Sequence, residues 1–100
     1  MSGDAIRVLI IDDEKQIRRM LKAALEGFSY NIGEAATGHE GLSQTSIFHP
    51  VIVILDLGLP DLDGVEVIER LREWTQVPII VLSVRGHEDD KIKALDAGAD

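Results

Sequence analysis

Three short runs of large aliphatic residues recur along this 100-residue chain and limit the folds that it can adopt. They are AIRVLII at residues 5–11, VIVILDL at 51–57 and VPIIVLS at 77–83. Continuous runs of this length that are rich in valine and isoleucine are typical of strands buried on both faces of a parallel sheet. YNIGEAA, at residues 30–36, is a weaker fourth candidate strand. The chain is therefore expected to form a small sheet that needs cover on both sides.

The segments between these strands have the patterns of helices. Residues 14–27 place their apolar side chains at the i, i+3, i+4, i+7, i+8 spacing of one helical face: Ile17, Met20, Leu21, Ala24 and Leu25. Residues 37–40 (TGHE) fit a capping box that opens a second helix, and residues 64–74 and 87–100 have further helical patterns. The order β-α-β-α-β-α-β-α predicts an α/β three-layer sandwich, in which right-handed crossovers cover both faces of a parallel sheet.

Size and composition exclude several classes of function. One hundred residues allow a single domain, and 45% hydrophobic residues supply enough apolar area for a core. The net charge of −8 disfavours direct binding to nucleic acid, and the absence of cysteine excludes disulfides and thiolate metal sites. The sequence has no secretion signal and no apolar run of about 20 residues. A cytoplasmic protein with no membrane partner is therefore expected.

Acidic residues follow two of the strong strands directly. Asp12, Asp13 and Glu14 come after the first strand, and Asp56 comes near the end of the run at 51–57. In an open α/β sheet, ligands bind beyond the carboxyl ends of the strands, at the point where the strand order reverses. If these two strands are neighbours, at least three carboxylates meet at one edge of the sheet.

Carboxylates that meet in this way repel one another. Two unit charges about 4 Å apart interact by roughly 4 kcal/mol at an effective dielectric constant of about 20. Protonation would relieve this repulsion, and a divalent cation would relieve it better. Since the ligands are oxygens without histidine or cysteine, the expected metal is Mg²⁺. A carboxylate beside that metal can attack a phosphate donor and form an acyl phosphate, and the hydroxyl of Ser83 could donate a hydrogen bond to a phosphoryl oxygen.

Other functions fit these acidic residues less well. Asp61 and Asp63 invite comparison with a calcium-binding loop, but Leu59 and Arg70 occupy its first and last positions, so the two aspartates are interpreted as turn formers. A phosphatase with an aspartyl nucleophile needs a second aspartate at the position of Gly58. The chain has no glycine-rich phosphate loop with lysine and serine or threonine, and its three histidines are expected at the surface.

Four motifs, in this order and spacing, resemble the receiver domain of bacterial two-component response regulators of the OmpR/PhoB class. They are VLIIDDE, VILDLGLPDLDG, VPIIVLS and KALDAGAD. The resemblance covers almost the whole chain and implies a flavodoxin-like (CheY-like) sheet with the strand order 2-1-3-4. It further implies that a sensor histidine kinase donates a phosphoryl group, in a protein that controls transcription through a downstream DNA-binding domain.

The resemblance also implies roles for individual residues. Asp56 matches the phosphoryl acceptor, and Asp12 and Asp13 match the acidic pair of the family. Mg²⁺ would be bound directly by Asp13, Asp56 and the backbone carbonyl of Gly58, and through water by Asp12. Ser83 matches the switch hydroxyl.

The sequence departs from the family pattern at its end. The family continues into a fifth strand, which carries a lysine, and then into a fifth helix, and neither occurs in residues 1–100. The chain is therefore expected to be an incomplete receiver domain whose fourth strand forms an exposed apolar edge. An alternative function follows, in which a partial receiver acts only as an interaction or assembly module, as a homodimer or a strand-exchanged oligomer, without phosphotransfer.

Overall fold

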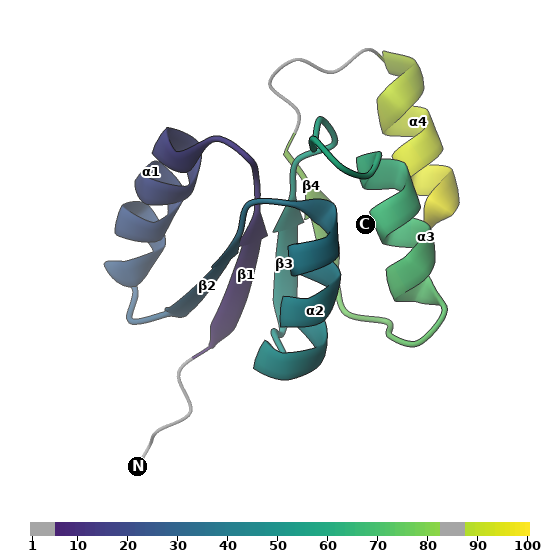
Figure 1. Cartoon of the computed structure of the whole chain (residues 1–100). Helices are drawn as coiled ribbons and strands as arrows, with labels where there is room; N and C mark the ends of the chain where they lie inside the picture. The colour runs from purple at the N-terminus through teal and green to yellow at the C-terminus, as the bar shows by residue number, and fades with distance from the viewer. Residues whose placement is uncertain (1–5, 83–87) are drawn as a thin grey trace.

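The computed structural model describes residues 6–82 and 88–100, and in this part of the chain strands and helices alternate (Figure 1). The elements are β1 (Arg7–Ile11), α1 (Lys15–Glu26), β2 (Asn31–Ala35), α2 (Gly38–Phe48), β3 (Ile52–Leu55), α3 (Gly64–Arg72), β4 (Ile79–Val81) and α4 (Glu88–Ala97). All three strand pairs are parallel, and the sheet has the order β2-β1-β3-β4. The predicted α/β class and the strand order 2-1-3-4 are confirmed.

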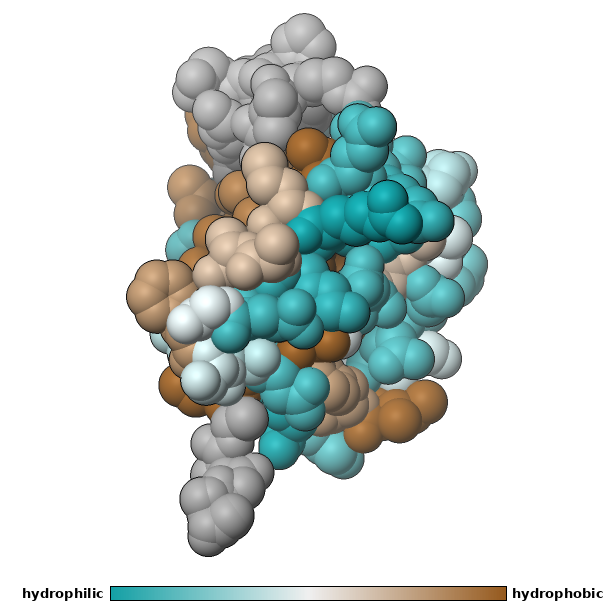
Figure 2. Space-filling model, turned by 90° about the vertical axis from the view of Figure 1, so that its left-hand side faces the viewer, coloured by the Kyte–Doolittle hydropathy of each residue, from teal (hydrophilic) through white to brown (hydrophobic). Residues whose placement is uncertain are grey.

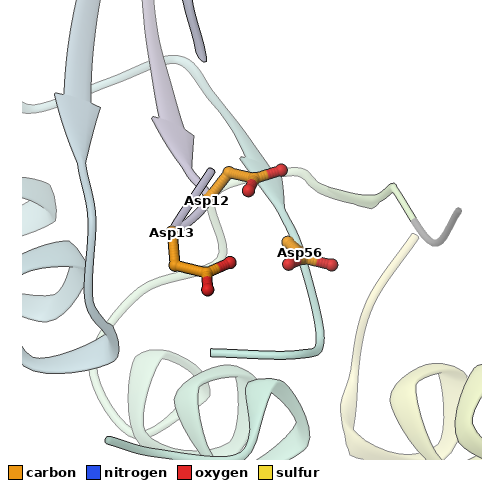
Figure 3. Close-up of side chains that lie close together, drawn as sticks. All are labelled: Asp12, Asp13 and Asp56. Atoms are coloured by element: carbon orange, nitrogen blue, oxygen red, sulfur yellow. The ribbon is translucent and has the colours of Figure 1, made fainter. Parts of the chain in front are cut away.

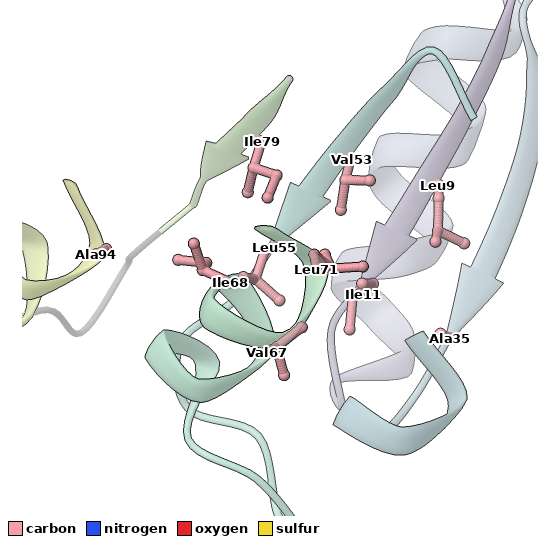
Figure 4. Packing of buried hydrophobic residues seen from close by; sticks show 10 residues of the cluster. All are labelled: Leu9, Ile11, Ala35, Val53, Leu55, Val67, Ile68, Leu71, Ile79 and Ala94. Carbon is pink, nitrogen blue, oxygen red and sulfur yellow. The ribbon is translucent and has the colours of Figure 1, made fainter. Parts of the chain in front are cut away.

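The main core lies between one face of the sheet and the helices α2, α3 and α4. The parallel register places Leu9 beside Val53 and Ile11 beside Leu55, so that alternate residues of neighbouring strands point to the same side. The cluster of fully buried residues on this side is shown in Figure 4: Leu9, Ile11, Ala35, Val53, Leu55, Val67, Ile68, Leu71, Ile79 and Ala94. This core fixes the strands whose carboxyl ends carry the acidic residues.

The opposite face of the sheet is less covered than the sequence predicts. Only α1 lies on this side in the described part of the chain, and it contacts β1 and β2 (Figure 1). None of the residues of α1 is buried; in its predicted apolar stripe Met20 is 58% exposed. A helix about 10 Å wide covers about two strands that are 4.8 Å apart, which leaves Ile80 of β4 43% exposed. Figure 2 shows this side, with hydrophilic side chains over much of the surface and apolar atoms visible beside them.

The helix ends follow most of the capping signals in the sequence. Thr37 is the N-cap of α2, and its Oγ1 accepts a hydrogen bond from the backbone N–H of Glu40 at 3.1 Å. The Glu40 carboxylate accepts from the backbone N–H of Ala36 at 2.6 Å, one residue before the position that a capping box predicts. Gly98, directly after α4, has a φ of 117°, a backbone conformation that favours glycine and ends that helix.

A glycine in α2 allows the helix to approach β1 closely, and enlarging it should destabilise the fold. A Cβ at Gly41 would lie 2.6 Å from Cδ1 of the buried Ile11 and 3.0 Å from both of its Cγ atoms. We expect Gly41→Ala to lower the free energy of unfolding by about 1–3 kcal/mol, the usual cost of overpacking a core. For a domain of this size the melting temperature should fall by roughly 5–15 °C, as measured by circular dichroism.

Gly27→Ala is the matched control for this prediction. Gly27 has a helical φ of −61°, and a Cβ there would meet only the carbonyl oxygen of Ala24, at 3.4 Å. The melting temperature of the Gly27→Ala variant should therefore stay at or slightly above the wild-type value. Equal melting temperatures for the two variants would contradict the close packing of α2 on Ile11.

Candidate metal and phosphoryl site

Three aspartates meet at the carboxyl ends of β1 and β3, the two central strands of the sheet. Asp12 and Asp13 follow β1, and Asp56 follows β3 (Figure 3). Backbone hydrogen bonds hold these positions in register, because the Asp56 N–H donates to the carbonyl of Ile11 at 2.9 Å and the Asp12 N–H donates to that of Ala35 at 3.0 Å. Each aspartate offers a carboxylate oxygen that lies within 4.8 Å of the others. The predicted convergence of three carboxylates is confirmed.

The three carboxylates differ in their exposure, and in the described part of the chain none of them has a cationic partner. Asp12 is 6% exposed, Asp56 is half-buried and Asp13 is exposed. The backbone N–H of Glu14 donates to Asp12 Oδ1 at 2.8 Å, whereas Arg18 donates to the backbone carbonyl of Asp12 rather than to its carboxylate. Among the described residues, no lysine, arginine or histidine forms an ion pair with any of the three aspartates.

The surroundings of Asp12, the most buried of the three carboxyls, raise its pKa. Burial raises the pKa of Asp12 above its ordinary value, and the negative charges of Asp56, Asp13 and Glu14 raise it further. The hydrogen bond from the Glu14 amide opposes the rise and only partly offsets it. The ionised Asp12 therefore lowers the stability of the metal-free protein, and a cation in the cluster would offset this effect.

The donor set of the cluster fits a hard divalent cation. It consists of carboxylate oxygens alone, without imidazole or thiolate, which is the ligand type that Mg²⁺ prefers. Gly58 lies close by in the same loop as Asp56, because a Cβ at Gly58 would be 3.8 Å from Asp56 Oδ2. The backbone of this residue is therefore near enough to share in the same site.

The loop after β3 is closed tightly at its base. The Gly64 N–H donates to the carbonyl of Leu57 at 3.1 Å, and a Cβ at Gly64 would lie only 2.6 Å from the backbone Cα of Leu57. Only glycine permits this approach, which sets the course of the chain from Asp56 through Gly58 to the start of α3.

The structure places some, but not all, of the other residues that were selected from the sequence. Ser83 lies outside the described residues, so the structure does not place its hydroxyl. Asp63 caps α3 by accepting from the Val65 N–H at 3.0 Å, which agrees with its interpretation as a turn former. Asp61 does more than form a turn, since its two oxygens accept from the backbone N–H groups of Gly38 and His39, at 2.7 and 2.9 Å. Nothing in the local sequence of Asp61 indicates this contact, because its partners lie 22 and 23 residues away.

Comparisons with known proteins agree with this geometry. The family model of the response regulator receiver domain matches residues 8–100. The chain is 56% identical, over 93% of its length, to the KDP operon transcriptional regulatory protein KdpE of Escherichia coli (strain K12). It is 42% identical, over the same share, to the transcriptional regulatory protein SrrA of Staphylococcus aureus (strain NCTC 8325 / PS 47). The crystal structure of a CheY-like response regulator receiver domain protein from Methanospirillum hungatei JF-1 superimposes with a TM-score of 0.90 at 30% identity, over 97% of this chain and 78% of that one.

Both of these regulatory proteins are much longer than this chain. The chain spans 41% of the length of KdpE and 39% of that of SrrA. In residues 6–82 and 88–100 no helix has the length and apolar character that a bilayer-spanning segment needs. The family match and the resemblance to KdpE favour the receiver interpretation over the assembly module without phosphotransfer. On its fold, its acidic cluster and these matches, the chain belongs to the response regulator receiver domain family.

Proposed function

We propose that this chain accepts a phosphoryl group on Asp56, with Mg²⁺ bound beside it, from the phosphohistidine of a sensor histidine kinase. The observation that carries the proposal is the cluster of Asp12, Asp13 and Asp56 at adjoining strand ends, with which no cationic side chain of the described residues forms an ion pair. Three carboxylates in this arrangement repel one another, a divalent cation would relieve that repulsion, and a cation with free positions can also hold a phosphoryl group.

The residues have distinct roles in this proposal. Asp13, Asp56 and the backbone carbonyl of Gly58 bind the metal directly, and Asp12, the most buried of the three aspartates, contacts it through water. When bound, Mg²⁺ neutralises the carboxylates and the charge on the phosphoryl oxygens. Ser83, assigned from the sequence alone, donates a hydrogen bond to a phosphoryl oxygen.

The transfer is a substitution at phosphorus. One carboxylate oxygen of Asp56 forms a bond to phosphorus, and the bond from phosphorus to the imidazole nitrogen of the donor breaks. The electron pair leaves with that nitrogen, which yields an aspartyl phosphate and a free histidine. Water later attacks the aspartyl phosphate, releases inorganic phosphate and restores Asp56.

The names and lengths of the relatives support a role for this domain in the control of transcription. Both KdpE and SrrA are named as transcriptional regulatory proteins, and each is more than twice as long as this chain. We infer that the phosphorylated receiver acts in the cytoplasm and controls transcription through a separate DNA-binding domain. With a net charge of −8, residues 1–100 are not proposed to bind DNA themselves.

A small-molecule phosphoryl donor tests the proposal without knowledge of the kinase. The protein is incubated with acetyl phosphate, with either Mg²⁺ or EDTA, and its intact mass is measured. We expect the mass to increase by one phosphoryl group only with Mg²⁺, and the modification to be lost in hydroxylamine, which cleaves acyl phosphates. An unchanged mass, or a modification that does not depend on Mg²⁺, would contradict the proposed function.

A further inference from the structure

The loop that joins β3 to α3 carries two of the proposed metal ligands and then reaches across to another helix. Its apolar residues Leu59 and Leu62 pack against the main core. Leu62 also lies against the first turn of α2, because a Cβ at the buried Gly38 would be 2.9 Å from the Cβ of Leu62. The tip of the loop is therefore in contact with the N-terminus of α2.

The carboxylate of Asp61 satisfies half of the free backbone donors at that N-terminus. Its Oδ1 accepts from the N–H of Gly38 at 2.7 Å, and its Oδ2 accepts from the N–H of His39 at 2.9 Å. Thr37 Oγ1 accepts from the Glu40 N–H, and the Thr37 carbonyl accepts from the Gly41 N–H in the first regular bond of the helix. Three of the four N–H groups that have no partner within the helix, those of Gly38, His39 and Glu40, thus have side-chain acceptors, and two of these three bonds are made by the loop after β3.

Together with backbone hydrogen bonds, these contacts connect the two sides of the acidic cluster. Asp12 is hydrogen-bonded to the carbonyl of Ala35, at the end of β2, and α2 begins three residues after Ala35. On the other side, Asp56 is hydrogen-bonded to the carbonyl of Ile11, and the loop leads from Asp56 to Asp61. The Asp61 carboxylate joins the two sides, so that the loop with Gly58 is held relative to the ends of β1 and β2.

We propose that Asp61 is a positioning residue for the metal site, because its carboxylate fixes the loop that presents Asp56 and Gly58 opposite Asp12 and Asp13. This inference rests on the proposed function, since it concerns the same Mg²⁺ and the same acceptor. Asp61 does not touch the cluster; it acts through the backbone that it anchors. The two hydrogen bonds from α2 to the ionised Asp61 carboxylate are intact at neutral pH, because the amide donors of His39 and Gly38 hold the pKa of Asp61 below its ordinary value.

The test compares Asp61→Ala with Asp63→Ala in the otherwise unchanged protein. Both substitutions remove one carboxylate from the same loop, and both remove a helix cap, but of these two side chains only that of Asp61 is hydrogen-bonded to α2. Mg²⁺ affinity is measured by titration calorimetry, and the position of the loop is followed by the amide NMR shift of Gly58. The acetyl phosphate reaction is then followed as a function of the Mg²⁺ concentration.

For Asp61→Ala we expect the Mg²⁺ dissociation constant to rise about tenfold, the lower end of the effect of removing a residue that supports a metal ligand. The Mg²⁺ concentration that gives half the maximal reaction rate should rise equally, while the rate at saturating Mg²⁺ stays within about twofold of wild type. Asp61→Asn, which keeps one acceptor oxygen, should give an intermediate affinity. For Asp63→Ala the dissociation constant should change by less than about twofold, as an exposed charge predicts.

Each outcome separates this inference from the proposed function. If the wild-type protein binds no Mg²⁺, the proposed function fails, whatever Asp61 does. If the wild type binds Mg²⁺ and the two alanine variants bind it equally well, Asp61 only caps a helix and the inference is wrong. Should Asp61→Ala fail to fold, as circular dichroism would reveal, the same comparison between Asp61→Asn and Asp63→Asn decides the question.

Discussion

Replacing Asp56 with asparagine is expected to abolish phosphorylation of this chain by acetyl phosphate in the presence of Mg²⁺. The amide has the same shape as the carboxylate, but its oxygen is a poor nucleophile towards phosphorus and cannot form a stable acyl phosphate. We expect the initial rate to fall by at least about a thousandfold, the scale of loss when the nucleophile of a covalent step is removed. Intact mass measured over time checks this result.

The matched control is Asp63→Asn, in the same loop. Asp63 is exposed, and its side chain caps α3 through the Val65 N–H, so the substitution changes the charge of the loop and leaves the acceptor in place. Its phosphorylation rate should stay within about twofold of wild type. If Asp56→Asn were modified as fast as Asp63→Asn, the phosphoryl group would have another acceptor, and the role proposed for Asp56 would be wrong.

The parts of the fold and the site that the sequence predicts are those with local signals. Each strong strand lies in a run of mostly aliphatic residues, and Asp12 and Asp56 follow β1 and β3 directly. Because the carboxyl ends of parallel strands lie at one edge of a sheet, the position of each aspartate in the sequence also gives its position in the fold. Asp63 is predictable in the same way, as a residue that precedes a helix and caps it.

The parts that the sequence does not predict depend on distant partners. Asp61 stands two residues before Asp63 in the same turn-like sequence, but its partners are N–H groups of α2, 22 and 23 residues earlier. The exposure of Met20 in α1 has a similar cause. Periodicity shows which face of a helix turns to the sheet, whereas burial also depends on the neighbours that lie beside that helix.

The second large effect is expected for Asp12→Asn, which should stabilise the metal-free protein and weaken its response to Mg²⁺. The amide removes a buried charge and its repulsion with Asp13 and Asp56, and it keeps an acceptor for the Glu14 N–H. We expect the free energy of unfolding at pH 7 without metal to rise by about 1–3 kcal/mol, a fraction of the interaction between close charges near a protein surface. Urea denaturation measures this difference.

The contribution of Asp12 to the stability of the metal-free protein depends on pH in a definite direction. Since the pKa of Asp12 is raised in the folded state, the folded protein holds this proton more tightly than the unfolded chain does. The contribution of Asp12 to stability therefore falls as the pH rises from its ordinary pKa through the raised value, and the loss is complete above that value. The advantage of Asp12→Asn should accordingly be small in acid and reach its full size at neutral pH.

Magnesium should stabilise wild type more than Asp12→Asn and so offset the advantage of the variant. At about 100 times its dissociation constant, a bound ion stabilises wild type by about 2.7 kcal/mol, whereas a variant that binds tenfold to a hundredfold more weakly gains only about 1.4 to 0.4 kcal/mol at the same concentration. Asp96→Asn, an exposed site on α4, removes the same charge from the chain and should change neither the stability nor the metal response measurably. If Asp12→Asn destabilised the metal-free protein, or if Mg²⁺ stabilised it as much as wild type, the repulsion among the three aspartates would not be what a cation relieves at this site.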